Sequence, residues 1–442
     1  MENLVQYLIY KKNPLRQLGI IGLKRAHLEA DIERNKKILD ESAAEFGPHQ
    51  NLTNAQRTLA QFKCQEALYD HALQKWISRL IFAAAGPIVL GLFVLKNLKH
   101  SPKRPVKVFV FNLGSISYAK SEFLTEDFLS GSVGKDIGVY LGFKEIKFMA
   151  QTVFSNPQYI LHPKLIVNVM RWLAAYAWVV KYHEPKTIAT FFEGTASSSL
   201  LTQYLNDQGI QHYNFAHGEH FRFDCYSAYA NFNRYVIWGR HFENVQIEKH
   251  CRSEMFSIRA PDHFKKYFFE IRNLQKINQK QLTVLIHSGV EKGRVEYDHL
   301  LGLLKELPLR WKVVLRPHPV DRASWPQVKV DLEIDLQKSG YPMTLDVELP
   351  ERIPMTESVK QSPVFVGSAS AALLEALLAG CKIIYLPGRL KNPDVIERHR
   401  ISVNVFSFQH DNVQPDFKTF INSEFVKTQD EDFKIHYLFE LD

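Results

Sequence analysis

The sequence predicts an α/β protein with two doubly wound domains in tandem, preceded by a helical region. From residue 106 onward, short apolar runs recur along the chain, and most of them end in a turn that contains glycine or proline. Helical segments stand between these runs, which is typical of parallel sheets. A polar helical stretch, residues 262–280, separates the first series from the second. We therefore expect a helical region at 1–100, a first α/β domain at 101–275 and a second at 276–442, facing each other across a cleft.

Length, composition and charge are consistent with this organisation. The chain has 442 residues, of which 45% are hydrophobic and 23% are charged, enough for a substantial core. The four cysteines are scattered, without disulfide or zinc-ligand spacing, which indicates a reducing compartment. The net charge is +8, and residues 1–105 hold 16 Lys/Arg against 9 Asp/Glu, so +7 arises there. This excess predicts an acidic partner, and the nearly neutral α/β body favours anionic lipid over nucleic acid.

The N-terminal region predicts two helices. The first covers about residues 15–46 and ends at Gly47-Pro48. The second starts near Leu52 and keeps a seven-residue apolar rhythm to Trp76, with Glu66 as its one polar interruption. The two helices predict an antiparallel hairpin, or a coiled-coil contact between copies of the chain in a homo-oligomer.

An uncharged apolar segment follows at residues 80–95. Its sixteen residues are short for a membrane span, which needs about twenty. Gly86-Pro87 in its middle predicts a kink or a break. Four basic residues flank it: Lys75, Arg79, Lys96 and Lys99. We expect a monotopic or re-entrant membrane segment; a buried core helix and a membrane span are the alternatives.

The first α/β domain offers two candidates for a catalytic base at strand ends. Its strands are predicted at 106–112, 188–192, 212–216 and 235–238. The strand at 212–216 runs into His217-Gly218, and an imidazole has an ordinary pKa near neutral pH. The strand at 188–192 runs into Glu193-Gly194, which offers a carboxylate in the same kind of position. His217 is preferred. A turn-forming histidine and a helix-capping glutamate are the structural alternatives.

The second α/β domain begins with a strand at 282–286, which ends in His287-Ser288-Gly289. A second strand, from Trp311, ends in Arg316-Pro317-His318-Pro319. The two prolines exclude a helix start there. A permanent cation and an imidazole therefore stand at the carboxyl end of a strand, the edge at which α/β sheets bind ligands. A rigid turn without a ligand is the alternative.

A third strand, 363–366, leads into Gly367-Ser368-Ala369-Ser370 and a helix at 371–380. Backbone N–H groups and hydroxyls at a helix N-terminus form an anion site, although such residues also serve as plain helix caps. With the Arg316 loop and Ser288, this turn predicts a pocket for the phosphate of a nucleotide. Glu375, on the same apolar helix, needs a partner such as a ribose diol or a Lys or Arg side chain.

The order of these loops resembles that of bacterial GT-B glycosyltransferases of cell-surface polysaccharides. Capsule polysialyltransferases and related sialyltransferases carry an acid-acid-Gly motif, a His-Pro motif and a serine pair. Teichoic-acid-type polymerases are similar, with a His-Gly base loop and an Arg-Pro-His loop. The resemblance covers about residues 185–390 and implies two Rossmann-like domains, the first binding an acceptor and the second a nucleotide donor.

The resemblance also implies roles for single residues. His318 and Pro319 match the His-Pro motif, so His318 would contact the donor phosphate. Ser368 and Ser370 match the serine motif, although Ala369 splits them. The other departure is the base loop, which reads His217-Gly218 without an acid pair; this favours a histidine base and weakens the case for sialic acid as the donor sugar.

The residues and the resemblance together predict a glycosyltransferase with a nucleotide-sugar donor, CMP-linked by preference, and a glycan or lipid-linked acceptor. No DxD-like motif stands at a strand end, so we expect neither a metal nor another cofactor. The alternatives are a CDP-polyol phosphotransferase of teichoic-acid type and a non-catalytic membrane-bound scaffold. The expected location is the cytoplasmic face of the bacterial inner membrane.

Overall fold

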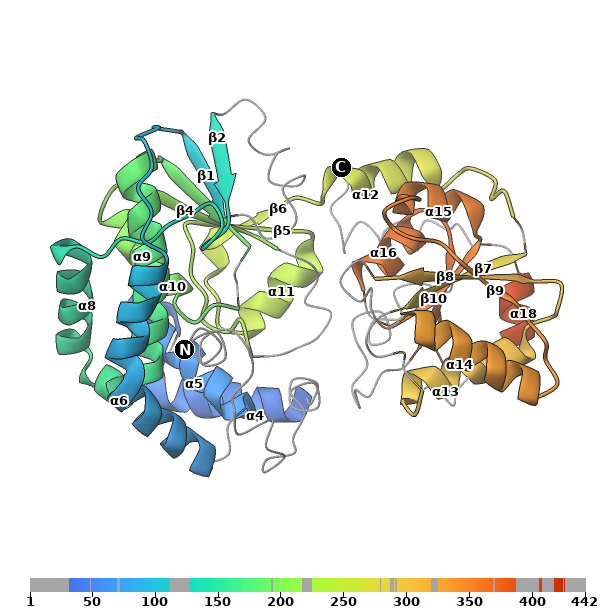
Figure 1. The fold of residues 1–442 in the computed structure, drawn as a ribbon, viewed down its shortest axis with the longest axis horizontal. Helices are drawn as coiled ribbons and strands as arrows, with labels where there is room; N and C mark the ends of the chain where they lie inside the picture. Colours follow the sequence, from blue (N-terminus) through green and yellow to red (C-terminus); the bar gives the residue numbers. More distant parts are fainter. Residues whose placement is uncertain are drawn as a thin grey trace. The chain divides into compact units, whose positions relative to one another are not determined.

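The structure is a computed structural model of the 442-residue chain. It describes residues 32–47, 49–69, 72–111, 127–191, 194–216, 225–278, 280–286, 290, 292–318, 325–368, 370–386, 405–407, 417–423 and 425. The chain divides into two compact units (Figure 1). Unit 1 takes residues 1–217, 223–237 and 241–258, and unit 2 takes 218–222, 238–240 and 259–442.

Unit 1 is built on a parallel sheet with the strand order β2-β1-β3-β4-β5-β6. Its strands are β1 (Val108–Phe111), β2 (Phe128–Gly131), β3 (Thr187–Thr190), β4 (Gln211–Phe215), β5 (Arg234–Ile237) and β6 (Phe256–Ile258). The chain runs outward from β1 to β2 on one side and from β3 to β6 on the other. The sheet direction therefore reverses between β1 and β3, and such a reversal marks the ligand edge of doubly wound sheets.

Unit 2 is built on a second parallel sheet with the order β12-β11-β10-β7-β8-β9. Its strands are β7 (Gln281–Ile286), β8 (Lys312–Pro317), β9 (Leu345–Val347), β10 (Val364–Gly367), β11 (Lys382–Tyr385) and β12 (Val405–Ser407). The direction reverses between β7 and β10. Two doubly wound parallel α/β sheets confirm the predicted fold class, and the cleft between the units stays a prediction.

Helices cover the faces of both sheets. Unit 1 contains α4 (Ile32–Phe46), α5 (Asn54–Tyr69), α6 (Ala72–Lys96), α8 (Phe143–Ser155), α9 (Pro163–His183), α10 (Ser198–Asn206), α11 (Arg240–Glu248), η1 (His49–Asn51), η2 (Pro157–Leu161) and η3 (Ser253–Met255). Unit 2 contains α12 (Asp262–Lys265), η4 (Lys266–Ile271), α13 (Val295–Glu306), α14 (Trp325–Lys338), α15 (Met355–Gln361), α16 (Ala371–Leu378) and α18 (Phe417–Asn422).

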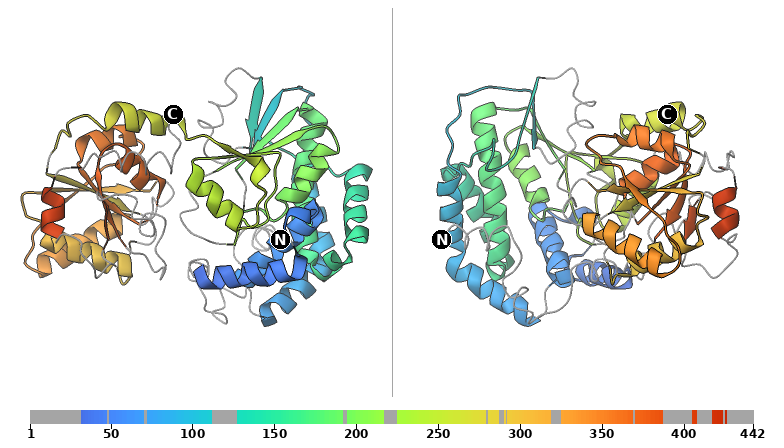
Figure 2. Two further views of the ribbon diagram at one scale, coloured as in Figure 1. Left: turned by 180° about the vertical axis from the view of Figure 1, so that it is seen from behind. Right: turned by 45° about the vertical axis from the view of Figure 1, so that its right-hand side comes forward.

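The helices form layers around each sheet (Figures 1 and 2). In unit 1, α9 and α10 pack on the sheet through a core that includes Phe111, Leu173 and Leu201. Helix α5 packs against α10, and α6 and α8 pack against α9. In unit 2, α13 and α14 lie on one face of the sheet, and α15 and α16 lie on the other. Because both faces are covered, the central strands are continuous apolar runs, as parallel strands usually are.

Helix α6 corrects one prediction. It continues without a break through Gly86 and Pro87. A Cβ atom added at Gly86 would lie 2.9 Å from Cγ2 of Val167 on α9, so the glycine lets the two helices come close together. The close packing on α9 stabilises a continuous helix although Pro87 removes one helical hydrogen bond. A re-entrant segment requires the chain to turn back at Gly86-Pro87, and this prediction is therefore wrong.

The N-terminal helices belong to unit 1 rather than to a region of their own. Helix α4 begins at Ile32, and residues 15–31 of the predicted helix lie outside the described residues. The second predicted helix is two helices, α5 and α6. Leu59 and Phe62 on α5 lie in the core of unit 1, so their apolar rhythm is used within the chain. A homo-oligomer contact stays a prediction.

The boundary between the units differs from the predicted 275/276. The long continuous part of unit 2 begins at Arg259, because the segment after it is hydrogen-bonded to α16 and to the residue that follows it. The hydroxyl of Tyr267 donates to Glu375 at 2.9 Å, and Lys276 Nζ donates to the carbonyl oxygen of Ala379 at 2.6 Å. The polar stretch after residue 262 is therefore part of unit 2, not a linker.

Candidate active site

The two predicted donor loops flank one strand of unit 2. In the sheet, β7 pairs with β8 on one side and with β10 on the other. Ile286, the last residue of β7, is in register with Pro317, and the β7–β10 register, continued from Val284↔Val366, brings it level with Ser368. His318 extends the pairing, because its N–H donates to the carbonyl oxygen of Ile286 at 2.7 Å. The His318 loop and the Ser368 turn therefore stand two strand spacings apart, about 10 Å, beside the reversal point of the sheet.

Arg316 connects the end of β8 to the segment that follows β9. Its guanidinium pairs with the carboxylate of Glu348 and donates to the carbonyl oxygen of Ile353 at 2.8 Å. The side chains of Arg316 and Glu348 are only 8% and 6% exposed. The pair fixes the segment after β9 against the end of β8. Glu348 already balances the charge of Arg316. Direct contact of Arg316 with a donor phosphate stays a prediction.

A cavity of about 310 Å³ opens beside His318. Its wall comes from three places in unit 2: Pro317 and His318 after β8, Trp325 at the start of α14, and Leu349, Pro350, Glu351 and Arg352 after β9. The volume is within the range of small-molecule sites. An indole can stack on a nucleobase, and a guanidinium is suited to phosphate.

The serine turn after β10 has two different serines. Ser368 is buried, whereas Ser370 is the N-cap of α16 and its Oγ accepts a hydrogen bond from the N–H of Leu373 at 3.4 Å. A Cβ atom at Gly367 would lie 3.2 Å from Cβ of Leu285, so the glycine keeps the ends of β10 and β7 close. The helix-cap role is thus present, and phosphate binding by these serines stays a prediction.

Glu375 has protein partners that the sequence analysis did not anticipate. Its Oε2 accepts from the Tyr267 hydroxyl at 2.9 Å, and its Oε1 lies 3.6 Å from Nε2 of His263. Burial, followed by the neighbouring Glu375 carboxylate, raises the pKa of Tyr267, so this hydroxyl keeps its proton and donates. Among the described residues the partners of Glu375 are thus a tyrosine and a histidine, and a ribose contact stays a prediction.

The two candidate bases follow neighbouring strands at the same level. Thr190 on β3 is in register with Asn214 on β4, and the Thr190 hydroxyl donates to the Asn214 amide oxygen at 3.0 Å. Glu193 stands three residues after Thr190 in the sequence, and His217 stands three residues after Asn214. The strands that precede the two candidates in the sequence are thus neighbours in the sheet. Glu193 and His217 themselves lie outside the described residues.

The turn after Glu193 is held firmly. Gln65 on α5 donates from its Nε2 to the carbonyl oxygens of Gly194 and Tyr226, each at 2.8 Å. A Cβ atom at Gly194 would lie only 2.1 Å from Cε1 of the Tyr226 ring, so no larger residue fits there. Helix α5 therefore positions the strand end that carries the carboxylate candidate.

Other predicted site residues fall in parts of the chain that are not described. These are Ser288 and Pro319, in addition to Glu193 and His217. Among the described residues, no group of three or more His, Cys, Asp or Glu side chains comes together as a metal site. Metal-independent chemistry stays a prediction.

Sequence analysis missed three side chains at this edge of unit 2. Trp325 and Arg352 line the cavity, and Tyr267 holds Glu375. For Trp325 and Arg352, neighbouring prolines in the sequence could have indicated a special position. Trp325-Pro326 is a typical helix start, and Arg352 lies between Pro350 and Pro354, which predicts a rigid turn. Tyr267 gave no signal, since its contact depends on the packing of η4 against α16.

No protein-family model and no curated protein matches this sequence. Solved structures do show some similarity. HepE of Anabaena in complex with UDP is 13% identical, over 75% of this chain and 93% of that chain, with a TM-score of 0.43. A glycosyltransferase from Rickettsia africae is 11% identical, over 71% and 86%, with a TM-score of 0.39. UDP-GlcNAc 2-epimerase from Neisseria meningitidis, bound to UDP-GlcNAc, is 11% identical, over 68% and 86%, with a TM-score of 0.41. TM-scores below 0.5 neither establish a family nor transfer an activity.

Proposed function

We propose that this chain is a GT-B-type glycosyltransferase that moves a sugar from a nucleotide-activated donor to a glycan or lipid-linked acceptor. The observation that carries the proposal is the edge of the second sheet. There, the His318 loop and the Ser368 turn flank β7 at the reversal point, beside a cavity lined by Trp325 and Arg352. An aromatic ring, a cation and hydroxyl groups at one edge suit a nucleoside phosphate.

The reaction follows from the roles of these side chains. The base, His217 by preference and Glu193 otherwise, takes the proton from an acceptor hydroxyl. The hydroxyl oxygen then forms a bond to the anomeric carbon, and the bond from that carbon to the donor phosphate breaks. The electron pair stays on the phosphate oxygen, where His318 and the Ser368–Ser370 turn stabilise the negative charge.

The donor nucleotide is the finer part of the proposal. A CMP-sugar is preferred, because His318-Pro319 and Ser368 resemble the His-Pro and serine motifs of CMP-sugar enzymes. A CDP-polyol donor would use the same phosphate site, and would make the protein a polyol-phosphate transferase. The acceptor belongs to a cell-surface polysaccharide. The protein acts at the cytoplasmic face of the bacterial inner membrane, which suits the basic N-terminal region and the apolar helix α6.

A thermal-shift screen of the full-length chain against CMP, CDP, UDP and GDP tests the donor site. A ligand of the native state raises the unfolding temperature, and the nucleotide with the largest shift identifies the donor class. His318→Ala should remove the shift, because His318 lines the cavity. His299→Ala, on α13 outside the cavity, is the matched control and should keep it. The absence of a shift with all four nucleotides would favour a non-catalytic scaffold.

A further inference from the structure

Helix α6 presents an apolar stripe to solvent. Trp76, Leu80, Ile88 and Leu95 recur at helical spacing along it, and all are well exposed, Ile88 by 64%. No charged residue occurs between residues 80 and 95. The opposite side of α6 packs on α9. A helix that is apolar on both sides needs a second apolar environment for its outer side.

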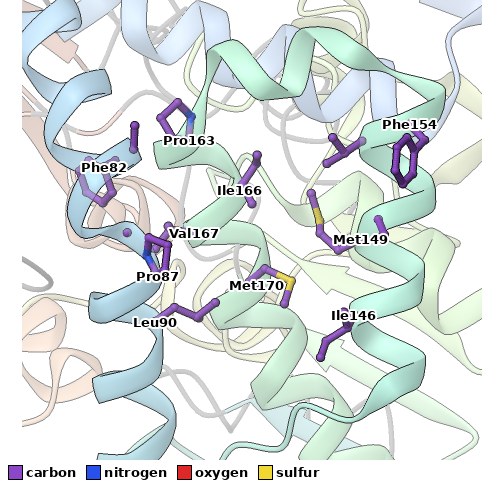
Figure 3. Close-up of a pocket in the computed structure, with 14 residues that line it drawn as sticks. Phe82, Pro87, Leu90, Ile146, Met149, Phe154, Pro163, Ile166, Val167 and Met170 are labelled. Carbon is purple, nitrogen blue, oxygen red and sulfur yellow. The ribbon is translucent and has the colours of Figure 1, made fainter.

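An apolar groove runs beside this stripe, with a volume of about 530 Å³ (Figure 3). Helix α9 forms its floor through Ile166, Val167 and Met170. One wall is α6, with Phe82 and Leu90, and the other is α8, with Ile146, Met149 and Phe154. Every residue that lines it is apolar. The Phe154 side chain at its rim is 83% exposed, so the groove opens at the surface.

A polar cavity of about 400 Å³ lies at the N-terminal end of the same helix face. Arg79 lines this cavity and precedes Phe82 of the groove by three residues, hence one helical turn. His162, also in the cavity, directly precedes Pro163, which lines the groove. The apolar groove and the polar cavity therefore follow each other along α6 and the start of α9. This is the shape of a site for a molecule with an apolar tail and a polar head.

Arg79 is the side chain of the polar cavity that suits a phosphate. Arg79 Nη2 lies 3.5 Å from Oε2 of Glu66, while its Nε is buried and has no hydrogen-bond partner among the described residues. Lys63 lines the same cavity but is paired with Glu45, and Glu41 lines it as well. The unmet donor of Arg79 is therefore what this cavity offers to a phosphate. Glu66 is itself engaged: burial raises its pKa, but the hydrogen bond with His162 and the charges of Lys164 and Arg79 outweigh burial and lower the pKa. An additional acceptor at Arg79 Nε would satisfy the orphan donor.

The packing of α6 favours a position along the membrane surface over one across it. By length and composition, Arg79–Lys96 is the only helical stretch among the described residues that could span a membrane. Yet α6 is fixed along α9, with Gly86 against Val167 and the Arg171 guanidinium 4.8 Å from the Phe93 ring centroid. Because α9 is itself part of the core on the first sheet, a spanning α6 would have to leave that core.

We propose that unit 1 docks on an anionic bilayer through α6 and α8, and that the groove takes one acyl chain of an anionic phospholipid whose phosphate reaches Arg79. Charge supports this lipid class: residues 71–100 contain Lys75, Arg79, Lys96 and Lys99 and no acidic residue. The exposed rim residues continue the surface of the groove into the bilayer. This inference is independent of the transfer reaction.

Vesicle partitioning of the full-length chain tests the docking face. The probe is a vesicle of phosphatidylglycerol and phosphatidylcholine, compared with pure phosphatidylcholine. Leu80→Glu with Ile88→Glu places two charges on the exposed stripe, and should lower partitioning about tenfold or more. Ile334→Glu, an exposed apolar site on α14 of unit 2, is the matched control and should leave it unchanged. Equal partitioning of wild type and the double variant would overturn the docking face.

Photocrosslinking tests the groove itself. Phosphatidylglycerol with a photoreactive group in its acyl chain should crosslink to peptides of α6, α8 and α9. Ala150→Phe fills the groove, and Phe154→Asp charges its exposed rim without disturbing the core; both should remove these crosslinks while thermal unfolding stays close to wild type. Arg79→Gln should reduce the preference for phosphatidylglycerol. Crosslinks elsewhere in the chain, or unchanged crosslinks in Phe154→Asp, would overturn the groove. Resistance of wild type to extraction at alkaline pH would instead show a spanning α6.

Discussion

Arg316 at the end of β8 and Glu348 directly after β9 form a buried ion pair at the edge of the second sheet. The N–H of Glu348 also donates to the carbonyl oxygen of Leu315 at 2.9 Å, so backbone and side chains hold the same junction. The segment that follows Glu348 forms one wall of the cavity beside His318. The pair therefore sets the shape of the candidate donor site.

Removal of one partner of this pair should destabilise unit 2. Arg316→Ala leaves Glu348 buried without its cation, and such a loss costs about 3–5 kcal/mol of unfolding free energy. Urea denaturation measures it. The matched control is Lys312→Ala, because Lys312 pairs with Asp346 between the same two strands at 3.0 Å but is largely exposed. That variant should cost less than about 1 kcal/mol. Equal losses in the two variants would contradict the role of burial.

Two substitutions separate the candidate bases. His217→Ala should abolish sugar transfer, because the acceptor hydroxyl would keep its proton, while nucleotide binding in unit 2 persists. Glu193→Ala should retain transfer with a reduced rate. Turnover with a saturating donor and the nucleotide Kd are the measurements. An active His217→Ala beside an inactive Glu193→Ala would reverse the preference and make the carboxylate the base.

Tyr267 and Glu375 can be distinguished by what each substitution changes. Tyr267→Phe removes a hydrogen bond to a carboxylate, so unit 2 should lose about 1.5–3 kcal/mol of stability. Its nucleotide affinity should change little, because the carboxylate remains. Glu375→Ala should weaken nucleotide binding if the carboxylate holds the ribose. Calorimetric titration with the nucleotide from the thermal-shift screen reads out both variants, and unchanged affinity in Glu375→Ala would remove the ribose role.

Because His212 is buried, the unfolding free energy of unit 1 should decrease at acid pH. Burial lowers the pKa of His212 to about 3, and its ring nitrogens lie 2.7 Å from the Thr202 hydroxyl and 3.1 Å from the Tyr176 hydroxyl. Between this value and about 6.5 only the unfolded chain binds the proton, so stability falls as pH decreases below 6.5. At pH 5 the loss should be about 2 kcal/mol.

His212→Gln should reduce this loss of stability between pH 7 and pH 5. Urea midpoints at pH 7 and pH 5 measure the difference, and the exposed His100 provides the control substitution, His100→Gln. If His212→Gln loses as much stability between pH 7 and pH 5 as the wild type, other groups cause the loss.

Edge strands account for most of what sequence analysis missed in the fold. The eight predicted strands, the last of them the apolar run Ile383-Ile384-Tyr385-Leu386, are all present, whereas β2, β6, β9 and β12 were not predicted. These four are the edge strands of the two sheets. Each has three or four residues, and in β2 and β6 most side chains are only half-buried. An edge strand is covered on fewer sides, so its sequence lacks the continuous apolar run that reveals a central strand.

Sequence analysis predicted only those parts of the candidate site whose residues are neighbours in the sequence. Pro317-His318 and Ser368 follow from residues that are neighbours in sequence. The partner of Arg316 lies 32 residues away after a missed edge strand, and that of Glu375 lies 108 residues away. Such contacts depend on how β9 and η4 pack, which a local pattern does not encode. For the same reason, sequence analysis, which predicted a kink or a break at Gly86-Pro87, did not foresee a continuous helix there, because the contact with Val167 comes from another helix.

Each unit contains at least one buried cysteine whose reaction with a thiol reagent can report local unfolding of that unit. All four cysteines are buried and none forms a disulfide; Cys64, Cys225 and Cys251 lie in unit 1 and Cys381 lies in unit 2. Burial raises the pKa of Cys251 and of Cys381 to about 11, so neither is a thiolate near neutral pH. A thiol reagent therefore reacts at the rate at which a unit opens. Peptide mapping of the label would time the two openings in one experiment, and a bound nucleotide should slow only the reaction of Cys381.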